Sequence, residues 1–291
     1  MPGIVDGRVV IVTGAGQGLG RAHARAFAQE GAHVVVNDVG AKAHDVAEEI
    51  AAGGGSALAV AGDVADWHDA EILIQTPVHK FGRLDVLVNN AGIVRDRMLV
   101  SMTEQEWDDV TRVNLKGHFC PLRHAAAYWR ERSKAGEQVD ARIVNTSSGA
   151  GLLGSVGQGN YAAAKAAVAA LTIVAAAELA RYGITVNAIA PAARTPMTER
   201  VFAEAMRAPA EGFDAMNPAN VSPLVVWLGS SESAGVTGRM FEVEGGTVGI
   251  ADGWQHGPRV DKGERWRPAD IGPVVAQLLE DAPAPAPVYG S

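Results

Sequence analysis

Several sequence features that mark particular classes of protein, such as secreted, nucleic-acid-binding or membrane proteins, are scarce or absent in this chain. It has one cysteine, Cys120, among 291 residues, which excludes an internal disulfide and is typical of a reducing compartment. A net charge of −8 argues against a general affinity for nucleic acid. No run of about 18 apolar residues without a polar interruption is evident, and the start Met1-Pro-Gly lacks the features of a signal peptide. We therefore expect a soluble, cytoplasmic protein without membrane contact.

Metal-binding patterns and repeats are also missing. The sequence contains no paired-cysteine motif, no cluster of metal-ligand residues and no internal repeat. We expect no metal site. What the chain does contain is ordinary for a globular protein, with 47% hydrophobic and 20% charged residues.

Short apolar runs alternate with longer helical patterns along most of the chain. The runs predicted as strands are Arg8–Val12, Ala32–Asn37, Ala57–Val60, Leu84–Val88, Arg142–Val144, Ile184–Ala190 and Met240–Val243. Strands that are apolar on both faces and alternate with helices indicate a parallel sheet covered on both sides. The prediction is an α/β, Rossmann-like, doubly wound parallel sheet of seven strands. Residues 1–249 would form a single domain, and residues 250–291 a C-terminal extension with a proline-rich end.

A glycine-rich turn follows the first predicted strand and precedes a helix expected from about Leu19 to Glu30. Gly14, Gly18 and Gly20 allow the backbone to approach a pyrophosphate, while N–H groups at the helix start point toward its charge. Asp38 ends the second predicted strand, where an acid can accept hydrogen bonds from ribose hydroxyls. A simpler interpretation of Asp38 is a turn or N-cap residue.

Tyr161 and Lys165 lie four residues apart at the start of a long alanine-rich helix. This spacing puts both side chains on one helix face. A neighbouring ammonium should lower the phenol pKa by roughly 1–3 units and make Tyr161 a better base. Ser148, after the fifth predicted strand, supplies a hydroxyl that could hold the reacting oxygen. The alternative for Tyr161 and Lys165 is an ordinary pair on a helix surface.

Several motifs occur together in one order. Ser148, Tyr161 and Lys165, with Thr13–Gly20 and Asn89–Gly92 before them, resemble the short-chain dehydrogenase/reductase family over about residues 7–248. The resemblance implies an NAD(P)-dependent oxidoreductase. It also implies that Asn114, within a long helix expected from Met102 to Tyr128, kinks that helix and holds a water near the lysine. Otherwise Asn114 would be a tolerated polar position in a helix.

The resemblance assigns roles to two sets of residues. The catalytic set is Asn114, Ser148, Tyr161 and Lys165. The cofactor-binding set is Gly14, Gln17, Gly18, Leu19, Gly20, Asp38, Asp63, Val64, Asn90, Ala91, Gly92, Tyr161, Lys165, Pro191 and Thr195. The expected cofactor is NAD, because Asp38 would repel a 2′-phosphate and because Gln17 stands where NADP-using relatives often carry a basic residue.

Three further segments bear on assembly and substrate. The helix after Tyr161 is apolar on almost every side, so both faces should be covered. In the family a second subunit covers one of them, which predicts a homodimer or homotetramer. Residues 196–217 form either a substrate lid or a packed pair of surface helices. The extension, with Trp254, Trp266 and an apolar stretch at 271–279, should dock on the body or on a neighbour.

A narrower resemblance suggests the substrate. Val34–Gly40, Asn89–Met98 and Pro223–Leu228 are similar to (3R)-hydroxyacyl-CoA dehydrogenase domains of multifunctional β-oxidation proteins. The leading hypothesis is therefore an NAD-dependent 3-hydroxyacyl-CoA dehydrogenase whose small-molecule substrate is an acyl-CoA, bulky or steroid-derived chains included. One alternative is a steroid or other secondary-alcohol dehydrogenase. Another is a non-catalytic NAD sensor, although such sensors typically lack part of the catalytic set.

Overall fold

A single sheet organises the molecule, which is a computed structural model that describes residues 2–199, 204, 206–251, 253 and 255–289. The strands follow the order β3-β2-β1-β4-β5-β6-β7-β8, and all neighbours are parallel except β7 and β8. Their bounds are β1 Val9–Val12, β2 His33–Asp38, β3 Ser56–Ala61, β4 Val86–Asn89, β5 Ala141–Thr146, β6 Ile184–Ala192, β7 Met240–Glu244 and β8 Thr247–Ile250. The predicted doubly wound sheet is confirmed.

The expected count of seven strands was one too few. β8 pairs antiparallel with β7 through a turn at Gly245-Gly246, and Gly245 has a φ of 54°. A Gly-Gly pair between two short strands is a hairpin signal, since both residues accept the positive φ that tight hairpin turns require. The sheet thus continues to Ile250 and crosses the boundary expected after residue 249.

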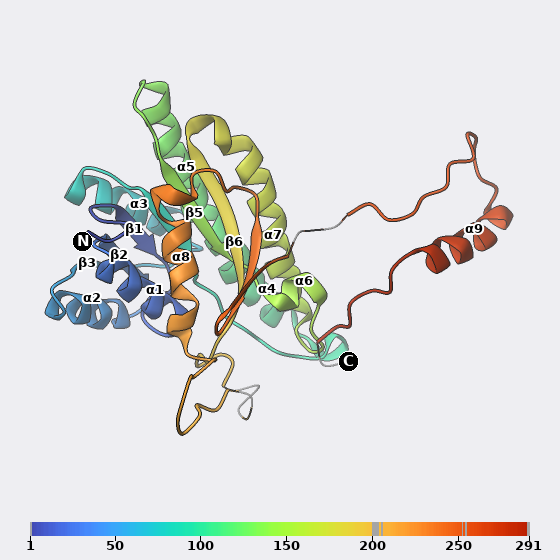
Figure 1. Cartoon of the computed structure of the whole chain (residues 1–291), viewed down its shortest axis with the longest axis horizontal. Helices are drawn as coiled ribbons and strands as arrows, with labels where there is room; N and C mark the ends of the chain where they lie inside the picture. The colour runs from blue at the N-terminus through green and yellow to red at the C-terminus, as the bar shows by residue number, and fades with distance from the viewer. Residues whose placement is uncertain (1, 200–203, 205, 252, 254, 290–291) are drawn as a thin grey trace.

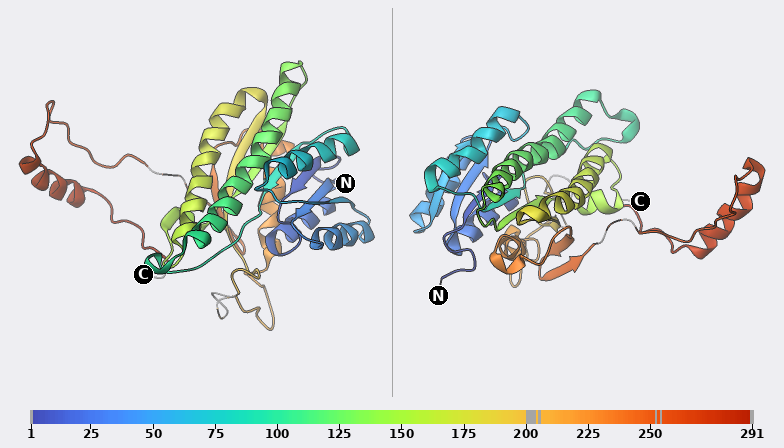
Figure 2. Two further views of the ribbon diagram at one scale, coloured as in Figure 1. Left: turned by 180° about the vertical axis from the view of Figure 1, so that it is seen from behind. Right: turned by 90° about the horizontal axis from the view of Figure 1, so that it is seen from above.

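Helices cover both faces of the sheet (Figure 2). The α1 and α8 helices contact each other on one face with α2 beside α1, while α3, α5 and α7 cover the other face. The helix bounds are α1 Gly18–Gln29, α2 Lys42–Ala52, α3 Trp67–Phe81, α4 Glu104–Thr111, α5 Gly117–Lys134, α6 Gly149–Leu153, α7 Gly159–Leu179, α8 Ser222–Leu228 and α9 Pro268–Asp281.

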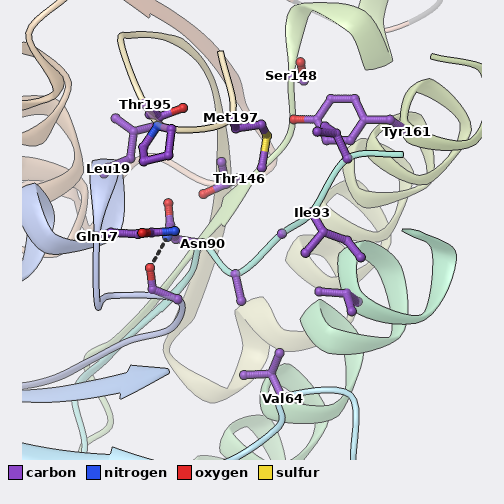
Figure 3. A pocket seen from close by; sticks show the side chains of 18 of the residues that line it. Gln17, Leu19, Val64, Asn90, Ile93, Thr146, Ser148, Tyr161, Thr195 and Met197 are labelled. Atoms are coloured by element: carbon purple, nitrogen blue, oxygen red, sulfur yellow. Dashed lines mark hydrogen bonds between the residues drawn. The ribbon is translucent and has the colours of Figure 1, made fainter. Parts of the chain in front are cut away.

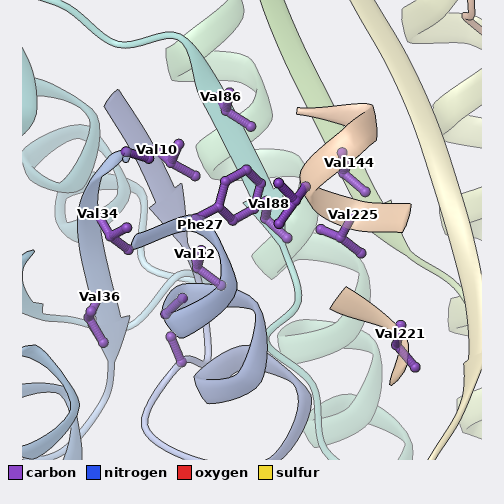
Figure 4. Packing of buried hydrophobic residues seen from close by; sticks show 14 of the residues in the cluster. Val10, Val12, Phe27, Val34, Val36, Val86, Val88, Val144, Val221 and Val225 are labelled. Carbon is purple, nitrogen blue, oxygen red and sulfur yellow. The ribbon is translucent and has the colours of Figure 1, made fainter. Parts of the chain in front are cut away.

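The core is divided by the sheet into two clusters, because alternate strand residues point to opposite faces. Val10 and Val12 of β1 pack in the cluster under α1 and α8, whereas Ile11 packs in the cluster under α3 and α5. Phe27 of α1 is fully buried among the valines of the first cluster (Figure 4). Burial of such a side chain stabilises the fold by roughly 1.5–3 kcal/mol. The packing fixes α1, and with it the glycine turn that precedes it.

The helix expected over Met102–Tyr128 is divided at Asn114. A capping box between Thr103 and Glu106 begins α4. A π-helical turn over Arg112–Lys116 then separates α4 from α5, which continues past the expected end at Tyr128 to Lys134. π-Helical turns are frequent at functional sites because they release backbone groups from the regular hydrogen-bond ladder.

Helix α7 is apolar over most of its length. Together with the 3-10 turn that follows it, over Gly159–Tyr182, it is long and apolar enough by composition to cross a membrane, although Lys165 and Thr172 interrupt its apolar run. In the structure α7 packs on β6 and β5, and 33% of its most apolar stretch is buried. This helix covers the sheet with one face and exposes the other, which carries Ile173 and Val174.

The segments after β6 follow the expectations only in part. Among the described residues of 196–217 there is no helix, so the alternative of a packed helix pair is wrong for them. Beyond β8, residues 255–287 extend away from the body, and α9 lies apart from it with no buried residue (Figures 1 and 2). The expected docking of the 271–279 stretch is therefore absent within this chain. Trp254, and residues 200–203 and 205 of the segment expected as a lid or helix pair, lie outside the described residues.

Candidate active site

A cavity of about 540 Å³ opens at the carboxyl ends of β1 and β4. The chain runs outward in opposite directions from these two central strands, and such switch points are where open α/β sheets bind ligands. The volume lies within the range of about 300–1,000 Å³ that is usual for small-molecule sites. In Figure 3, Ser148 and Tyr161 lie on one side of the cavity, while Gln17, Leu19 and Asn90 lie on the other.

The glycine turn between β1 and α1 is built for a close approach of the backbone. Gly14 and Gly18 have φ values of 60° and 54°, a conformation that L side chains rarely adopt. A Cβ on Gly20 would stand 2.3 Å from the Gly14 carbonyl oxygen. The N-cap residue Gln17 makes no side-chain cap bond to the start of α1. Free N–H groups at this helix start fit a pyrophosphate, so the turn fits a dinucleotide.

Asp38 lies at the far edge of the cavity, at the end of β2. Its carboxylate accepts hydrogen bonds from the backbone N–H of Gly16 at 3.0 Å and of Val39 at 2.8 Å. A carboxylate has about four lone-pair sites, so capacity for two ribose hydroxyls remains. The Lys42 ammonium lies close by and donates to Gln17 Oε1 at 2.7 Å. The edge therefore carries one negative and one positive side chain.

Thr13 joins two of the turns that line the cavity, although sequence reasoning did not select it as a site residue. Its hydroxyl accepts hydrogen bonds from the backbone N–H of Asn90 at 2.9 Å and of Ala91 at 3.1 Å. The Asn90 amide in turn donates to the carbonyl oxygens of Thr13 and Gly14. These bonds join the turn after β1 to the turn after β4. The threonine directly before the first glycine was the signal that could have found it.

Asn114 is fully buried in the π-helical turn, one layer behind the cavity wall. Its amide group forms two hydrogen bonds with the backbone of Ile93, each of 2.8 Å. A Cβ on Gly92 would stand 2.7 Å from Asn114 Oδ1, so the glycine is required there. Asn114 thus fixes the segment that leads from Gly92 into the substrate side of the cavity. The interpretation as a merely tolerated polar position does not fit these contacts.

Ser148 and Tyr161 are brought together by the short helix α6 and the loop after it. The Ser148 hydroxyl caps α6 by accepting from the Ala150 N–H at 3.2 Å. Burial raises the pKa of Tyr161 above its usual value, with Asp96 adding to this effect and a hydrogen bond with Ser148 opposing it. In the ligand-free protein the phenol is therefore a proton donor at neutral pH.

Lys165 is 2% exposed and donates from Nζ to the Thr146 carbonyl oxygen at 2.7 Å. Burial lowers the pKa of Lys165 to about 7. The ammonium lies 5.7 Å from the centroid of the Tyr161 ring. The expectation that it would lower the phenol pKa was wrong for the ligand-free protein. Desolvation by burial acts on both groups and favours their neutral forms.

The structure gathers the expected site residues around one cavity. All of them line it except Asn114: Gly14, Gln17, Gly18, Leu19, Gly20, Asp38, Asp63, Val64, Asn90, Ala91, Gly92, Ser148, Tyr161, Lys165, Pro191 and Thr195. Asp63 forms an ion pair with Arg112 of the π-helical turn. Ile93 and Gln158, which sequence reasoning did not assign, also line the cavity, as does Met197 of the segment expected as a substrate lid.

Comparisons with known proteins agree with this geometry. A family model described as short chain dehydrogenase matches residues 8–205. Hydroxyacyl-CoA dehydrogenase ChsB1 of Mycobacterium tuberculosis is 47% identical, with 92% of this chain and 87% of that protein covered. Peroxisomal multifunctional enzyme type 2 of Mus musculus is 42% identical over 84% of this chain, which spans 32% of that longer protein. A solved short chain dehydrogenase from Mycobacterium avium has 63% identity and a TM-score of 0.93, with 99% of this chain and 100% of that one covered.

The chain therefore belongs to the short-chain dehydrogenase family. It is an NAD(P)-dependent oxidoreductase of that family, and its similarity to hydroxyacyl-CoA dehydrogenases, expected from the motifs, is confirmed.

Proposed function

We propose that the protein is an NAD-dependent dehydrogenase of 3-hydroxyacyl-CoA thioesters. The observation that carries the reaction is the convergence of Ser148, Tyr161 and Lys165 beside a dinucleotide cradle. Support for the substrate class comes from the 47% identity to a hydroxyacyl-CoA dehydrogenase over nearly the whole chain. Asp38, at the edge where the adenosine ribose should lie, supports NAD rather than NADP.

The bound nicotinamide would supply the hydride acceptor in this reaction. Ser148 would donate a hydrogen bond to the substrate oxygen and hold it next to the phenol. Tyr161 would take the hydroxyl proton during oxidation and return it during reduction, a role worth about 10²–10⁴-fold in rate. Lys165 would bind ribose hydroxyls and favour the phenolate once a cationic ring reduces the cost of a negative charge there.

Asn114 would act through the backbone rather than by touching the substrate. Its two bonds to Ile93 hold the strand-end segment, and the π-helical turn releases backbone groups near Lys165. A water held there would connect the lysine to a proton relay. Met197, which lines the cavity after β6, would belong to a substrate lid.

The substrate class is tested by initial rates of NADH formation. The panel pairs 3-hydroxyacyl-CoA thioesters with free steroid alcohols and simple secondary alcohols, each over a full range of concentrations. We expect kcat/KM for at least one thioester to exceed that of every free alcohol by about a hundredfold, because binding energy from a remote group is used at the reacting carbon. A free alcohol as the best substrate would favour the steroid or secondary-alcohol alternative. NAD binding without any turnover would favour the sensor.

We also propose that the protein is a homodimer or homotetramer. The outer face of α7 exposes Ala163, Ala166, Ala170, Ile173 and Val174. An apolar face of this kind on a helix is typical of an interface, and closed symmetry is the usual form of such assemblies. Sedimentation at micromolar concentration should show no monomer, and Ile173→Glu should shift the protein toward one. A wild-type monomer would contradict the proposal.

A further inference from the structure

The chain returns to the body at its end, after the long excursion that carries α9. The tail segment, Val288–Tyr289, lies against the loop between α6 and α7 (Figure 1). The Val156 N–H donates to the Tyr289 carbonyl oxygen at 2.9 Å, and the Tyr289 N–H donates to the Gly154 carbonyl oxygen at 3.3 Å. These bonds form a parallel bridge between Ser155 and Tyr289. The tail segment is thus attached to the loop that joins Ser148 to Tyr161.

The side chains of the tail segment pack on glycines of this loop. A Cβ on Gly149, directly after Ser148, would stand 2.9 Å from the Tyr289 hydroxyl and 3.1 Å from a ring carbon. A Cβ on Gly154 would stand 3.3 Å from Val288 Cγ1. Both glycines therefore leave space that the tail segment fills. The Tyr289 ring therefore packs against Gly149, the residue that directly follows Ser148, and Ser148 is proposed to hold the substrate oxygen.

The opposite side of the same loop carries a third segment. The Arg97 N–H donates to the Gly157 carbonyl oxygen at 2.7 Å, and Arg97 forms a parallel bridge with Gln158. The Gln158 amide donates to Asp96 at 3.1 Å, and both residues line the cavity. Segments around 97, 155 and 289 therefore lie side by side at the mouth of the cavity.

Large apolar side chains are exposed on these three segments. We call them the apolar rim: Leu99, Val100, Val156, Val288 and Tyr289, with exposed fractions from 42% to 96%. A concentration of exposed apolar side chains at one place marks a binding surface. Because the rim adjoins the cavity through Gln158 and Asp96, a ligand that reacts at Ser148 can continue over it. Its apolar character suits a hydrocarbon chain rather than the anionic phosphates of coenzyme A.

We propose that the tail segment and the apolar rim bind the hydrocarbon chain of the acyl substrate, and that Tyr289 determines chain-length specificity. This inference rests on the proposed function as a thioester dehydrogenase. Tyr289 contacts the hydrocarbon chain of the substrate rather than the reacting atoms, so it affects the affinity for the substrate. A short substrate, which ends inside the cavity, should be insensitive to it.

The test compares 3-hydroxybutyryl-CoA with 3-hydroxyhexadecanoyl-CoA in the full chain. Tyr289→Ala should raise KM for the long substrate about tenfold, because the hydrocarbon chain of the substrate loses its contact with one aromatic ring. KM for the short substrate and both kcat values should stay within about twofold. Tyr289→Phe, which keeps the ring, should resemble wild type for both substrates. The matched control is Leu279→Ala, because Leu279 is 71% exposed on α9, outside the rim.

Three outcomes would overturn the inference. An equal change in KM for both substrates would mean that Tyr289 only supports the loop. No change in KM for either substrate would mean that Tyr289 does not contact the substrate. A change in sedimentation without a change in chain-length dependence would assign the rim to a contact between subunits. Val156→Ser provides an independent variant on the same rim and should act in the same direction. Failure of wild type to oxidise either thioester would instead reject the proposed function.

Discussion

Replacing Asp38 with serine should weaken NAD binding and narrow the preference for NAD over NADP. The Asp38 carboxylate already accepts two backbone N–H bonds, from Gly16 and Val39, and these hold it at the cavity edge. Charge-assisted bonds from two ribose hydroxyls would contribute about 1.5–3 kcal/mol each. Serine retains one weaker hydroxyl. We therefore expect NAD affinity to fall by about ten- to a hundredfold.

The discrimination against NADP follows from charge. Two like unit charges about 4 Å apart repel by roughly 4 kcal/mol at an effective dielectric near 20. Lys42 opposes this, because its ammonium is held at the same edge by Gln17. A 2′-phosphate also loses one ribose hydrogen bond, so we expect NAD to keep a preference of at least about a hundredfold in kcat/KM, which corresponds to about 2.7 kcal/mol.

The assay is a pair of saturation curves, for NAD and for NADP, with wild type, Asp38→Ser and Lys42→Gln. Asp38→Ser should lose NAD affinity, whereas Lys42→Gln should leave NAD nearly unchanged and weaken NADP further. The double variant Asp38→Ser, Val39→Arg should gain affinity for NADP. A wild type that already prefers NADP would refute the placement of Asp38 beside the ribose.

Two other predictions concern stability. Burial lowers the pKa of Lys165 from 10.5 to about 7, so the unfolded chain binds more protons than the folded one between these pH values. Stability should therefore rise with pH across this window, by up to about 1.4 kcal/mol per pH unit. Urea unfolding at pH 7, 8 and 9 should show this rise in wild type and not in Lys165→Met, and equal slopes would contradict it. Asp140 pairs with Arg8 and with Arg142, which is 1% exposed. Asp140→Asn should lower the free energy of unfolding by about 2 kcal/mol because a buried charge loses its partner, whereas Glu131→Gln at an exposed pair should change it by less than about 1 kcal/mol. Equal effects of these two substitutions would reject that reasoning.

The fold could be predicted from the sequence because its signals are local. Valine-rich runs such as Val9–Val12 can be buried on both faces only in a covered parallel sheet, and the glycine turn after them has few other uses. The hairpin at Gly245-Gly246 was also a local signal, but the glycine within Thr247–Ile250 obscured the strand. The interruption at Asn114 was expected only from the family resemblance, as a kink, because helix propensities do not distinguish a π-helical turn from a regular α-helix.

The residues that form the site could be predicted from the sequence, whereas the direction of their pKa shifts could not. Four-residue spacing placed Tyr161 and Lys165 on one helix face, as the structure shows. Their pKa values depend on how completely α7 is covered by β5 and α6, which no spacing reveals. The contact of Tyr289 with the loop beside Ser148 joins residues far apart in the sequence. Contacts of this kind come from tertiary structure alone.

Proton transfer by Tyr161 is the central claim, and one variant tests it most directly. Tyr161→Phe keeps the ring and removes only the hydroxyl, so the fold and NAD binding should be retained. With NAD and the best substrate of the panel, we predict that kcat falls by about 10³-fold or more, because no other group carries the proton, while the Kd for NAD changes by less than about twofold. A Tyr161→Phe variant that retains kcat within tenfold of wild type would contradict the account.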